Sequence, residues 1–315
     1  MAGKPGSQLR HRPADQRQRR HHHAVGVAIM PTMPIVDAHM HLWETSAHNW
    51  YPGLARFIDA GKPEIAGDFL LPDFDRGRGG IEVAGLVHVS ATTEPHAYLA
   101  ETRWVDGIAD ADPRPFAIVG AVDPALPKSE LIEHLDEQAQ TERFRGVRVF
   151  TGLSPNTPEA DAIAGWLQDH DCVFDLVAKP AEILDWIDFL AGYPELRVVL
   201  EHLGFPQGHS SDARTAWHNA ISLAAKETQW LCKLSGFGLI CRDLSWPTLE
   251  YWLESSVSLW GWRRLMFASN MPVDSLAGTY TDLVSTIDRI VTTDATDQEA
   301  EFFYRANAID TYRLR

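Results

Sequence analysis

Three ionisable side chains alternate along the short apolar segment IVDAHMH at residues 35–41. Alternate residues of a β-strand face the same side, so Asp37, His39 and His41 are expected to share one face. Burying three such groups is costly unless they are paired, hydrated or bound to a ligand. The segment therefore predicts a functional site, in which imidazoles hold a metal ion or polarise a carbonyl group.

Polar residues also lie at the ends of several other apolar segments. They are His88 and Ser90, Arg148, Asp175, Glu201 and His202, Lys233 and Ser235, Asn270, and Asp274. Each is weak support by itself, because a lone strand-end histidine is more often structural, and a buried lysine such as Lys233 usually pairs with a carboxylate such as Asp175. Together with the first histidine pair, they indicate that several strands end at one opening.

The segments that must position these residues recur along the chain. Eight β-branched apolar runs begin at residues 35, 83, 117, 144, 173, 197, 231 and 264, with helix-like stretches between them. After the longer first gap, the starts are 24–34 residues apart, which is the length of a strand, a loop and a helix. We predict a single (β/α)8 TIM barrel over residues 34–315, with its functional groups at the carboxyl ends of the strands. The structural alternative is an open, doubly wound sheet.

A long insertion, residues 42–82, separates the first two runs. It exceeds an ordinary connection between a strand and a helix, so we expect a lid-like excursion over the pocket. The insertion contains Trp43 and Trp50, and Trp43 is a candidate for stacking on a substrate ring. The alternative for both tryptophans is a small core within the insertion itself.

The charge of the chain is unevenly distributed. The formal net charge is −15, but residues 1–33 carry six lysines and arginines against one aspartate, so the remainder carries −20. We expect a disordered basic leader over residues 1–33, with Met30 and Met33 as alternative start sites. An acidic body repels nucleic acid and anionic membranes, although a local basic pocket can hold a small anion. We therefore predict a small-molecule substrate, and neither nucleic acid nor a membrane as partner.

The three cysteines, Cys172, Cys232 and Cys241, lack CxxC spacing. This pattern is typical of reduced thiols in a cytoplasmic protein. No apolar stretch approaches the roughly 18 residues of a membrane-spanning helix. We predict a cytoplasmic protein, and leave open whether it is a monomer or a homodimer.

Six segments resemble the amidohydrolase 2 family of metal-dependent hydrolases, and in particular its branch of sugar-acid lactonases and pyrone dicarboxylate lactonase. They are VDAHMHLW (36–43), AETRW (100–104), RGVRVF (145–150), VVLEHLG (198–204), CKLSG (232–236) and RLMFASNMPVD (264–274). The resemblance spans about residues 35–310. It implies a (β/α)8 barrel that acts on a small carbonyl compound, often a lactone ring.

The resemblance also implies roles for individual residues. His39 and His41 correspond to the family's first-strand pair, and His202 corresponds to its sixth-strand histidine. Arg148 lies where lactonase relatives place an arginine that holds a substrate carboxylate, and Lys233 occupies the lysine position of the KLSG motif. We predict that the catalytic residues are His39, His41, His202, Asn270 and Asp274, and that the substrate contacts are His88, Arg148, Lys233 and Trp43.

The eighth run departs from the family pattern. Many members end this strand in GSDWP, whereas this chain has Ala268–Pro272, with Asn270 in the aspartate position. A neutral amide is neither a good metal ligand nor a base, so another carboxylate must activate water. Asp274 is the first choice because it is nearby, although it could instead cap the following helix.

The sequence leaves open whether the reaction uses a metal ion. His39, His41 and His202 can hold one divalent metal, zinc or manganese, and a metal-independent mode is nearly as well supported. In either mode we predict a hydrolase that opens a small cyclic ester, by attack of water on the ring carbonyl at the carboxyl end of the barrel. The substrate would carry a carboxylate or hydroxyl groups. The alternatives are a metal-dependent decarboxylase of the same family and a non-catalytic barrel.

Overall fold

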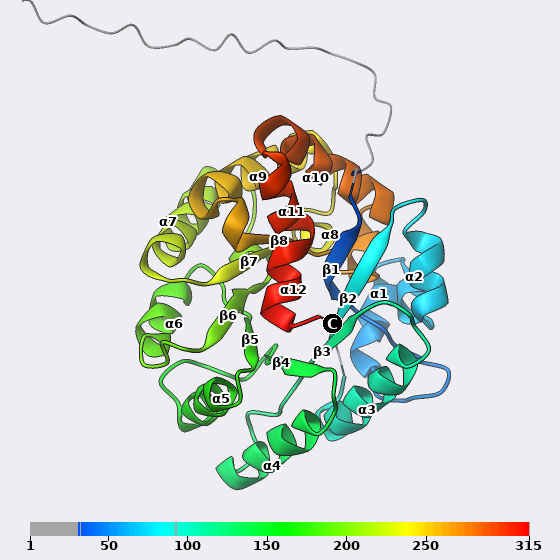
Figure 1. Ribbon diagram of the computed structural model, residues 1–315, viewed down its shortest axis with the longest axis vertical. Coiled ribbons are helices and arrows are strands. Elements are labelled where there is room, and N and C mark those ends of the chain that lie inside the picture. Colours follow the sequence, from blue (N-terminus) through cyan, green and yellow to red (C-terminus); the bar gives the residue numbers. More distant parts are fainter. Residues whose placement is uncertain (1–30, 32, 92, 315) are drawn as a thin grey trace, which may run out of the picture.

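Eight parallel strands form the centre of the molecule (Figure 1). The computed structural model describes residue 31, residues 33–91 and residues 93–314. The sheet order follows the sequence, with β1 (Ile35–Met40), β2 (Val83–Val89), β3 (Phe116–Gly120), β4 (Phe144–Arg148), β5 (Val173–Leu176), β6 (Arg197–Leu200), β7 (Leu231–Leu234) and β8 (Leu265–Phe267). Nearly all of the predicted leader lies outside the described residues, so its disorder stays a prediction.

The sheet closes on itself between β1 and β8. The backbone N–H of Asn270 donates to the carbonyl of His39 over 2.7 Å, and the N–H of His41 donates to the carbonyl of Met271 over 2.8 Å. An open sheet would leave these edge groups without such partners. The predicted (β/α)8 barrel is therefore confirmed, and the doubly wound alternative is wrong.

Helices surround the barrel and connect its strands (Figure 1). They are α1 (Ala55–Asp59), α2 (Leu71–Gly77), α3 (Tyr98–Ala109), α4 (Lys128–Ala139), α5 (Pro158–Asp169), α6 (Ile183–Leu190), α7 (Ser211–Glu227), α8 (Phe237–Ile240), α9 (Trp246–Trp260), α10 (Tyr280–Asp294), α11 (Asp297–Glu301) and α12 (Asn307–Tyr312). Short turns of 3-10 helix are η1 (Pro52–Leu54), η2 (Pro63–Ala66), η3 (Pro95–Ala97), η4 (Glu201–Gly204), η5 (Trp262–Arg264) and η6 (Val273–Leu276), and a π-helical turn, η7 (Phe302–Ala306), joins α11 to α12. In the described part of the chain, no helix has the length and apolar character needed to cross a membrane.

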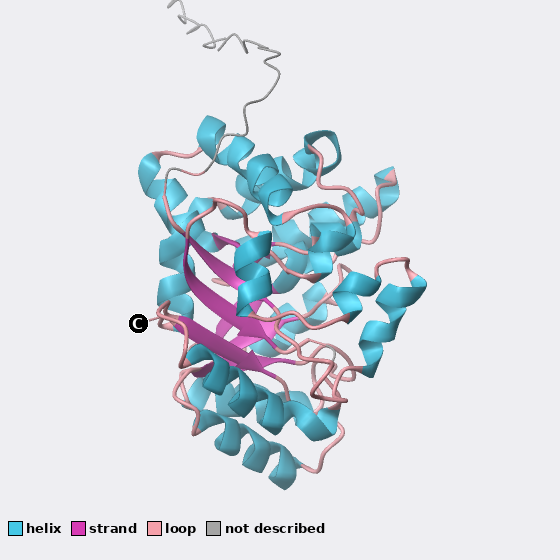
Figure 2. Ribbon diagram, turned by 90° about the vertical axis from the view of Figure 1, so that its right-hand side faces the viewer, coloured by secondary structure: helices cyan, strands magenta, loops and turns pink. Residues whose placement is uncertain are grey.

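The two ends of the barrel are built differently. Figure 2 shows the strands from the side, running toward a cluster of loops, with the C-terminus at the opposite end. At that opposite end α12 packs against the barrel, and its Tyr312 joins a cluster of small interior side chains that includes Val36, Ala38 and Val199. The carboxyl ends of the strands are thus left for the site.

The insertion after β1 forms a compact unit of its own. Its side chains pack around Trp43, Tyr51, Leu54, Phe57 and Ile65. Trp43 is fully buried and its indole N–H donates to the carbonyl of Gly67 over 2.8 Å. The insertion also packs on Val273 of η6, which anchors it to the segment that follows β8.

Candidate active site

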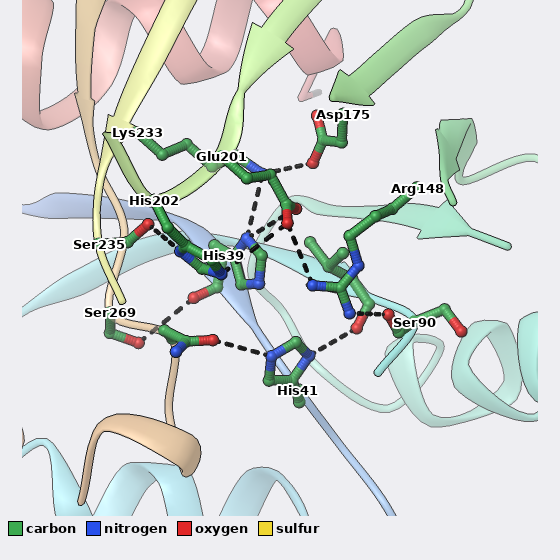
Figure 3. A network of polar contacts seen from close by, with 12 residues as sticks. His39, His41, Ser90, Arg148, Asp175, Glu201, His202, Lys233, Ser235 and Ser269 are labelled. Carbon is green, nitrogen blue, oxygen red and sulfur yellow. Dashed lines mark hydrogen bonds and ion pairs between the residues drawn. The ribbon is translucent and has the colours of Figure 1, made fainter. Parts of the chain in front are cut away.

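The carboxyl ends of five strands bring together many of the polar residues that the sequence predicted at one opening (Figure 3). They are His39 and His41 from β1, Arg148 from β4, Glu201 and His202 after β6, Ser235 after β7, and Asn270 after β8. All of these side chains are nearly inaccessible to solvent. The sequence predicted that these residues meet at one end of the barrel, and the structure brings them together there.

A bulge in β1 separates Asp37 from the two histidines. The register against β2 shifts between Asp37 and Met40, where one extra residue lies in β1. A bulge of this kind reverses the alternation of side chains. Asp37 instead accepts the backbone N–H of Ser269 over 2.8 Å. It also lies near Tyr280 of α10, outside the barrel, where burial and the charge of Asp37 raise the pKa of the tyrosine. The expectation that Asp37 shares a face with His39 and His41 is wrong.

His202 is held by the segment after β7. Its Nδ1 is hydrogen-bonded to Ser235 Oγ over 2.7 Å, and its Nε2 lies 3.8 Å from Glu201 Oε2, beyond hydrogen-bond distance. The backbone of His202 is left-handed, with φ of 48°, as are its neighbours Leu203 and Phe205. Such conformations are uncommon for residues with a Cβ and concentrate at functional sites.

Gly236 makes room for the His202 ring. A Cβ on Gly236 would lie 2.7 Å from His202 Cγ, and the glycine has φ of +73°. Both the space and the backbone conformation therefore require glycine here. Ser235 and Gly236 are the last two residues of the CKLSG segment, so this motif positions His202.

His41, Asn270 and Asp274 form a chain of hydrogen bonds behind the opening. The Nδ1–H of His41 donates to the carbonyl of Val89 over 2.7 Å, and its Nε2 lies 3.0 Å from Asn270 Oδ1. The amide of Asn270 in turn lies 2.8 Å from Asp274 Oδ1. Burial raises the pKa of Asp274 to about 7 and lowers the pKa of His41 to about 4. At neutral pH this chain accordingly contains an uncharged imidazole and a carboxyl group close to its titration point.

Two cations surround Glu201. Arg148 Nη1 donates to Glu201 Oε2 over 3.2 Å, and Lys233 Nζ lies 3.9 Å from Oε1. Burial acts to raise the pKa of Glu201, but the charges of Arg148, His202 and Lys233 outweigh it and the net shift is downward. Glu201 is therefore ionised and compensates much of the positive charge.

Lys233 belongs to the interior of the barrel. Its ammonium group is ion-paired with Asp175, and it lies 3.3 Å from His39 Nδ1. Asp175 also accepts the hydroxyl of Tyr312 over 2.7 Å. The ion pair of Lys233 with Asp175, considered from the sequence, is confirmed. All the described contacts of the ammonium group are with other side chains of the protein.

The cavity at the mouth of the barrel is small. Its lining residues are His41, Arg56, Ala91, Arg148, Phe150, His202, Leu239, Asn270 and Val273. Four of the predicted site residues are among them: His41, Arg148, His202 and Asn270. His39 lies beside them, with its ring centroid 4.7 Å from that of His202. Asp274 lies behind Asn270.

The remaining predicted substrate contacts lie away from this lining. Trp43 packs inside the insertion, and Lys233 lies deeper in the barrel. His88 is buried, accepts the backbone N–H of Leu42 over 3.2 Å, and faces Glu101 at 3.9 Å. A direct substrate contact for these three stays a prediction. Arg56 lines the cavity but was not among the predicted site residues. The insertion has no regular strand pattern, so the sequence could not show which way the Arg56 side chain points.

One group of described residues could hold a metal ion. His39, Glu201 and His202 each offer a ligand atom, and these atoms lie within 4.8 Å of one another. His39 Nε2 is buried without a hydrogen-bond partner, which suits a ligand atom. The group differs from the predicted trio in one member, since both ring nitrogens of His41 are hydrogen-bonded and Glu201 takes its place.

Known proteins resemble the chain over most of its length. A family model described as amidohydrolase matches residues 36–314. An L-fucono-1,5-lactonase of Burkholderia multivorans is 28% identical over 297 residues, which cover 89% of this chain and 96% of the relative. An uncharacterized protein of Sinorhizobium fredii is 27% identical over 305 residues, covering 90% of this chain and 100% of the relative.

A solved structure shares the fold. The crystal structure of an amidohydrolase from Burkholderia multivorans with bound zinc has a TM-score of 0.76 and 23% sequence identity. The match covers 90% of this chain and 100% of that chain. At this level of identity the similarity concerns the barrel itself.

Proposed function

The chain belongs to the amidohydrolase family, as its motifs predicted, and we propose that it is a hydrolase that opens a small lactone ring. One observation carries the proposal: His202 lines a cavity together with Arg148 and Asn270, and its imidazole Nε2 makes no hydrogen bond within the described part of the chain. The L-fucono-1,5-lactonases among the chain's relatives support the same activity. The substrate would carry a carboxylate or hydroxyl groups for the polar lining to bind.

His39 is placed to polarise the ring carbonyl. His39 Nδ1 lies 3.3 Å from Lys233 Nζ and 3.2 Å from Glu201 Oε1, so it can accept from the ammonium group or donate to the carboxylate. In the tautomer that accepts from Lys233, the proton of the neutral ring is on Nε2. Burial lowers the pKa of His39 well below 6.5, so the ring is neutral. Its buried Nε2–H has no partner in the described chain and can donate to the oxygen on which negative charge develops.

His202 is placed to move the proton. When Nδ1–H donates to Ser235 Oγ, the lone pair of Nε2 can take a proton from the attacking water. The ring C–O bond then breaks as the tetrahedral intermediate collapses, and His202 returns the proton to the leaving oxygen. Water has been added across the ester, and the product is an open-chain hydroxy acid.

A divalent metal ion would be held by His39, Glu201 and His202. When bound, zinc or manganese supplies Lewis acidity to the carbonyl. His39 would then use its other tautomer, with Nδ1–H toward Glu201 Oε1 at 3.2 Å. His202 Nε2 cannot serve as ligand and base at once, so metal occupancy distinguishes the two modes.

The cavity must widen before a substrate can bind. Its volume is about 30 Å³, whereas sites for small molecules usually have about 300–1,000 Å³. We propose that the insertion moves, because it supplies Arg56 to the lining and most of its core side chains pack on one another.

Acid release from a panel of sugar lactones and pyrones tests the activity. We expect turnover by the native chain and a loss of about 100- to 10,000-fold in kcat for His202→Asn. His96→Asn, at an exposed histidine, should be unaffected. No acid release from any lactone, with or without added zinc or manganese, would reject the proposal. Carbon dioxide release from aromatic carboxylates would instead favour the decarboxylase.

Metal analysis of the purified protein separates the two modes. One equivalent of metal, lost in His39→Ala together with activity, would favour the metal-assisted mode. Full activity in metal-free protein would favour His202 as the base. Whether the protein opens lactones is tested separately, by the acid-release assay with and without added metal.

A further inference from the structure

Arg56 brings a second guanidinium group to the cavity. It lies on α1 of the insertion and lines the cavity together with Arg148 of β4. Its guanidinium lies 4.8 Å from the ring centroid of Phe57. No carboxylate of the described chain lies within ion-pair distance of Arg56, so its hydrogen-bond donors are available to a ligand.

Arg148 also retains donors. One of its N–H groups is used on Glu201 and another on the carbonyl of Ser90, while Nε is buried without a partner. An arginine has five N–H groups in a planar fork, so the others can meet a second carboxylate. Glu201 is the carboxylate in contact with Arg148, and it is absent from the cavity lining.

The lining is therefore positive within an acidic protein. It contains two arginines and no aspartate or glutamate, although the chain has a net charge of −15. Burial and the charge of Arg148 both lower the pKa of Arg56, as expected for two like charges near one another. An anion placed between them would relieve this repulsion.

We propose that Arg56 and Arg148 together bind a carboxylate of the substrate, and that Arg56 makes the site selective for anionic lactones. This inference rests on the proposed lactonase function and narrows its substrate class. Arginine binds carboxylates through paired, charge-assisted hydrogen bonds, which a neutral sugar lactone cannot provide. Because Arg56 belongs to the insertion, the same contact holds the insertion over the bound substrate.

Binding of two stable ring analogues tests the inference without turnover. Tetrahydropyran-2-carboxylate carries the anion, and tetrahydropyran-2-methanol is its neutral counterpart. In calorimetry, Arg56→Gln should weaken binding of the carboxylate by about 10- to 100-fold and leave the alcohol unchanged, because hydrogen bonds to charged groups contribute about 1.5–3 kcal/mol. Arg56→Lys should recover part of the loss, since it keeps the charge without the fork.

Arg76→Gln is the matched control. Arg76 lies on α2 of the same insertion, is exposed and is ion-paired with Asp73, so its loss removes the same charge away from the cavity. It should leave binding of both analogues unchanged. An equal effect of Arg56→Gln on the two analogues, or no effect on either, would overturn the inference, as would a native chain that binds neither.

Kinetics separates this inference from the proposed function. With a lactone carboxylate and its methyl ester as substrates, Arg56→Gln should raise KM for the acid about 10- to 100-fold and leave the ester unchanged. If the native chain opens neither ring yet binds the carboxylate analogue in an Arg56-dependent way, the lactonase proposal fails and the anion site stands. If the native chain opens both rings and Arg56→Gln changes KM equally for the acid and the ester, the anion site is rejected and the lactonase proposal stands.

Discussion

The Nε2 atom of His41 lies 3.0 Å from the side-chain amide of Asn270. The Nδ1–H of His41 already donates to the Val89 carbonyl, so a neutral ring has only a lone pair to offer at Nε2. In the structure the Asn270 oxygen faces this lone pair and the Asn270 NH2 group faces Asp274. A 180° turn of the side-chain amide exchanges the two groups, so that the NH2 donates to His41 and the oxygen accepts from a protonated Asp274. Asparagine has a donor and an acceptor on one planar group and can link His41 to Asp274, which gives a physical reason for the residue at position 270.

Replacing Asn270 with aspartate should damage the site. Asn270→Asp would put a second carboxyl group about 2.8 Å from Asp274, and two carboxylates at that distance cannot both ionise. We expect the free energy of unfolding above pH 7 to fall by about 1–3 kcal/mol and lactone turnover to fall with it. Urea denaturation and the acid-release assay measure the two effects.

Asn219→Asp is the control for this substitution. Asn219 is exposed on α7, so the same chemical change there should alter neither stability nor turnover. If Asn270→Asp instead created turnover in a chain that otherwise had none, the non-catalytic barrel would become the better account of the native protein.

Gly236→Ala should displace His202. The new Cβ would lie 2.7 Å from the ring, and a misplacement of about 1 Å can lower kcat about 100-fold. Gly61→Ala is the matched control, because Gly61 has the same φ of +73° and no atom within 4 Å of the added Cβ. Both variants share the backbone strain of about 1–2 kcal/mol, so a further loss of kcat in Gly236→Ala reports the contact with His202. Equal kcat in both variants would mean that Ser235 alone positions His202.

The eight-fold repeat made the barrel predictable from the sequence. Strand length and the spacing of apolar runs are local properties, and the carboxyl ends of parallel strands necessarily meet at one end of a barrel. The sequence alone therefore predicts that His39, His202 and Arg148 lie in one site. Helix caps are equally local, since Thr157 and Ser210 each accept a backbone N–H from three residues further along the chain.

The rest depended on contacts that alternation does not encode. The bulge in β1 adds one residue to the strand, and it sends Asp37 outward while His39 stays inside. The insertion has no regular register, so the sequence could not show that Trp43 packs inward while Arg56 reaches the cavity. Side-chain direction in such a segment is decided by packing, which becomes visible only in three dimensions.

Lys233→Met distinguishes a structural lysine from a substrate contact. Removing the ammonium group leaves Asp175 and Glu201 buried without this partner, which should lower the free energy of unfolding by about 3–5 kcal/mol. Tyr312→Phe removes only a hydrogen bond to Asp175 and should cost about 1–3 kcal/mol. Urea denaturation measures both. Retained stability with a raised KM in Lys233→Met would support the substrate contact predicted from the sequence.

Glu101 should make stability depend on pH. Burial raises its pKa from 4.5 to about 7, against the hydrogen bonds donated by Ser90 and Thr93. Below pH 4.5 the carboxyl is protonated in both states, and between pH 4.5 and 7 only the folded state keeps the proton. The free energy of unfolding should therefore fall by up to about 3 kcal/mol as pH rises through this window.

Glu101→Gln should abolish this part of the dependence. Glutamine resembles the protonated carboxyl, so the variant should match the native chain near pH 4.5 and exceed its stability above pH 7. Glu130→Gln, at an exposed glutamate of α4, controls for the loss of one surface charge. The check is the difference in unfolding free energy between native chain and variant, measured by urea denaturation from pH 4.5 to 8. A difference that stays constant across this range would show that Glu101 ionises at its ordinary pKa and that its hydroxyl partners offset the cost of burial.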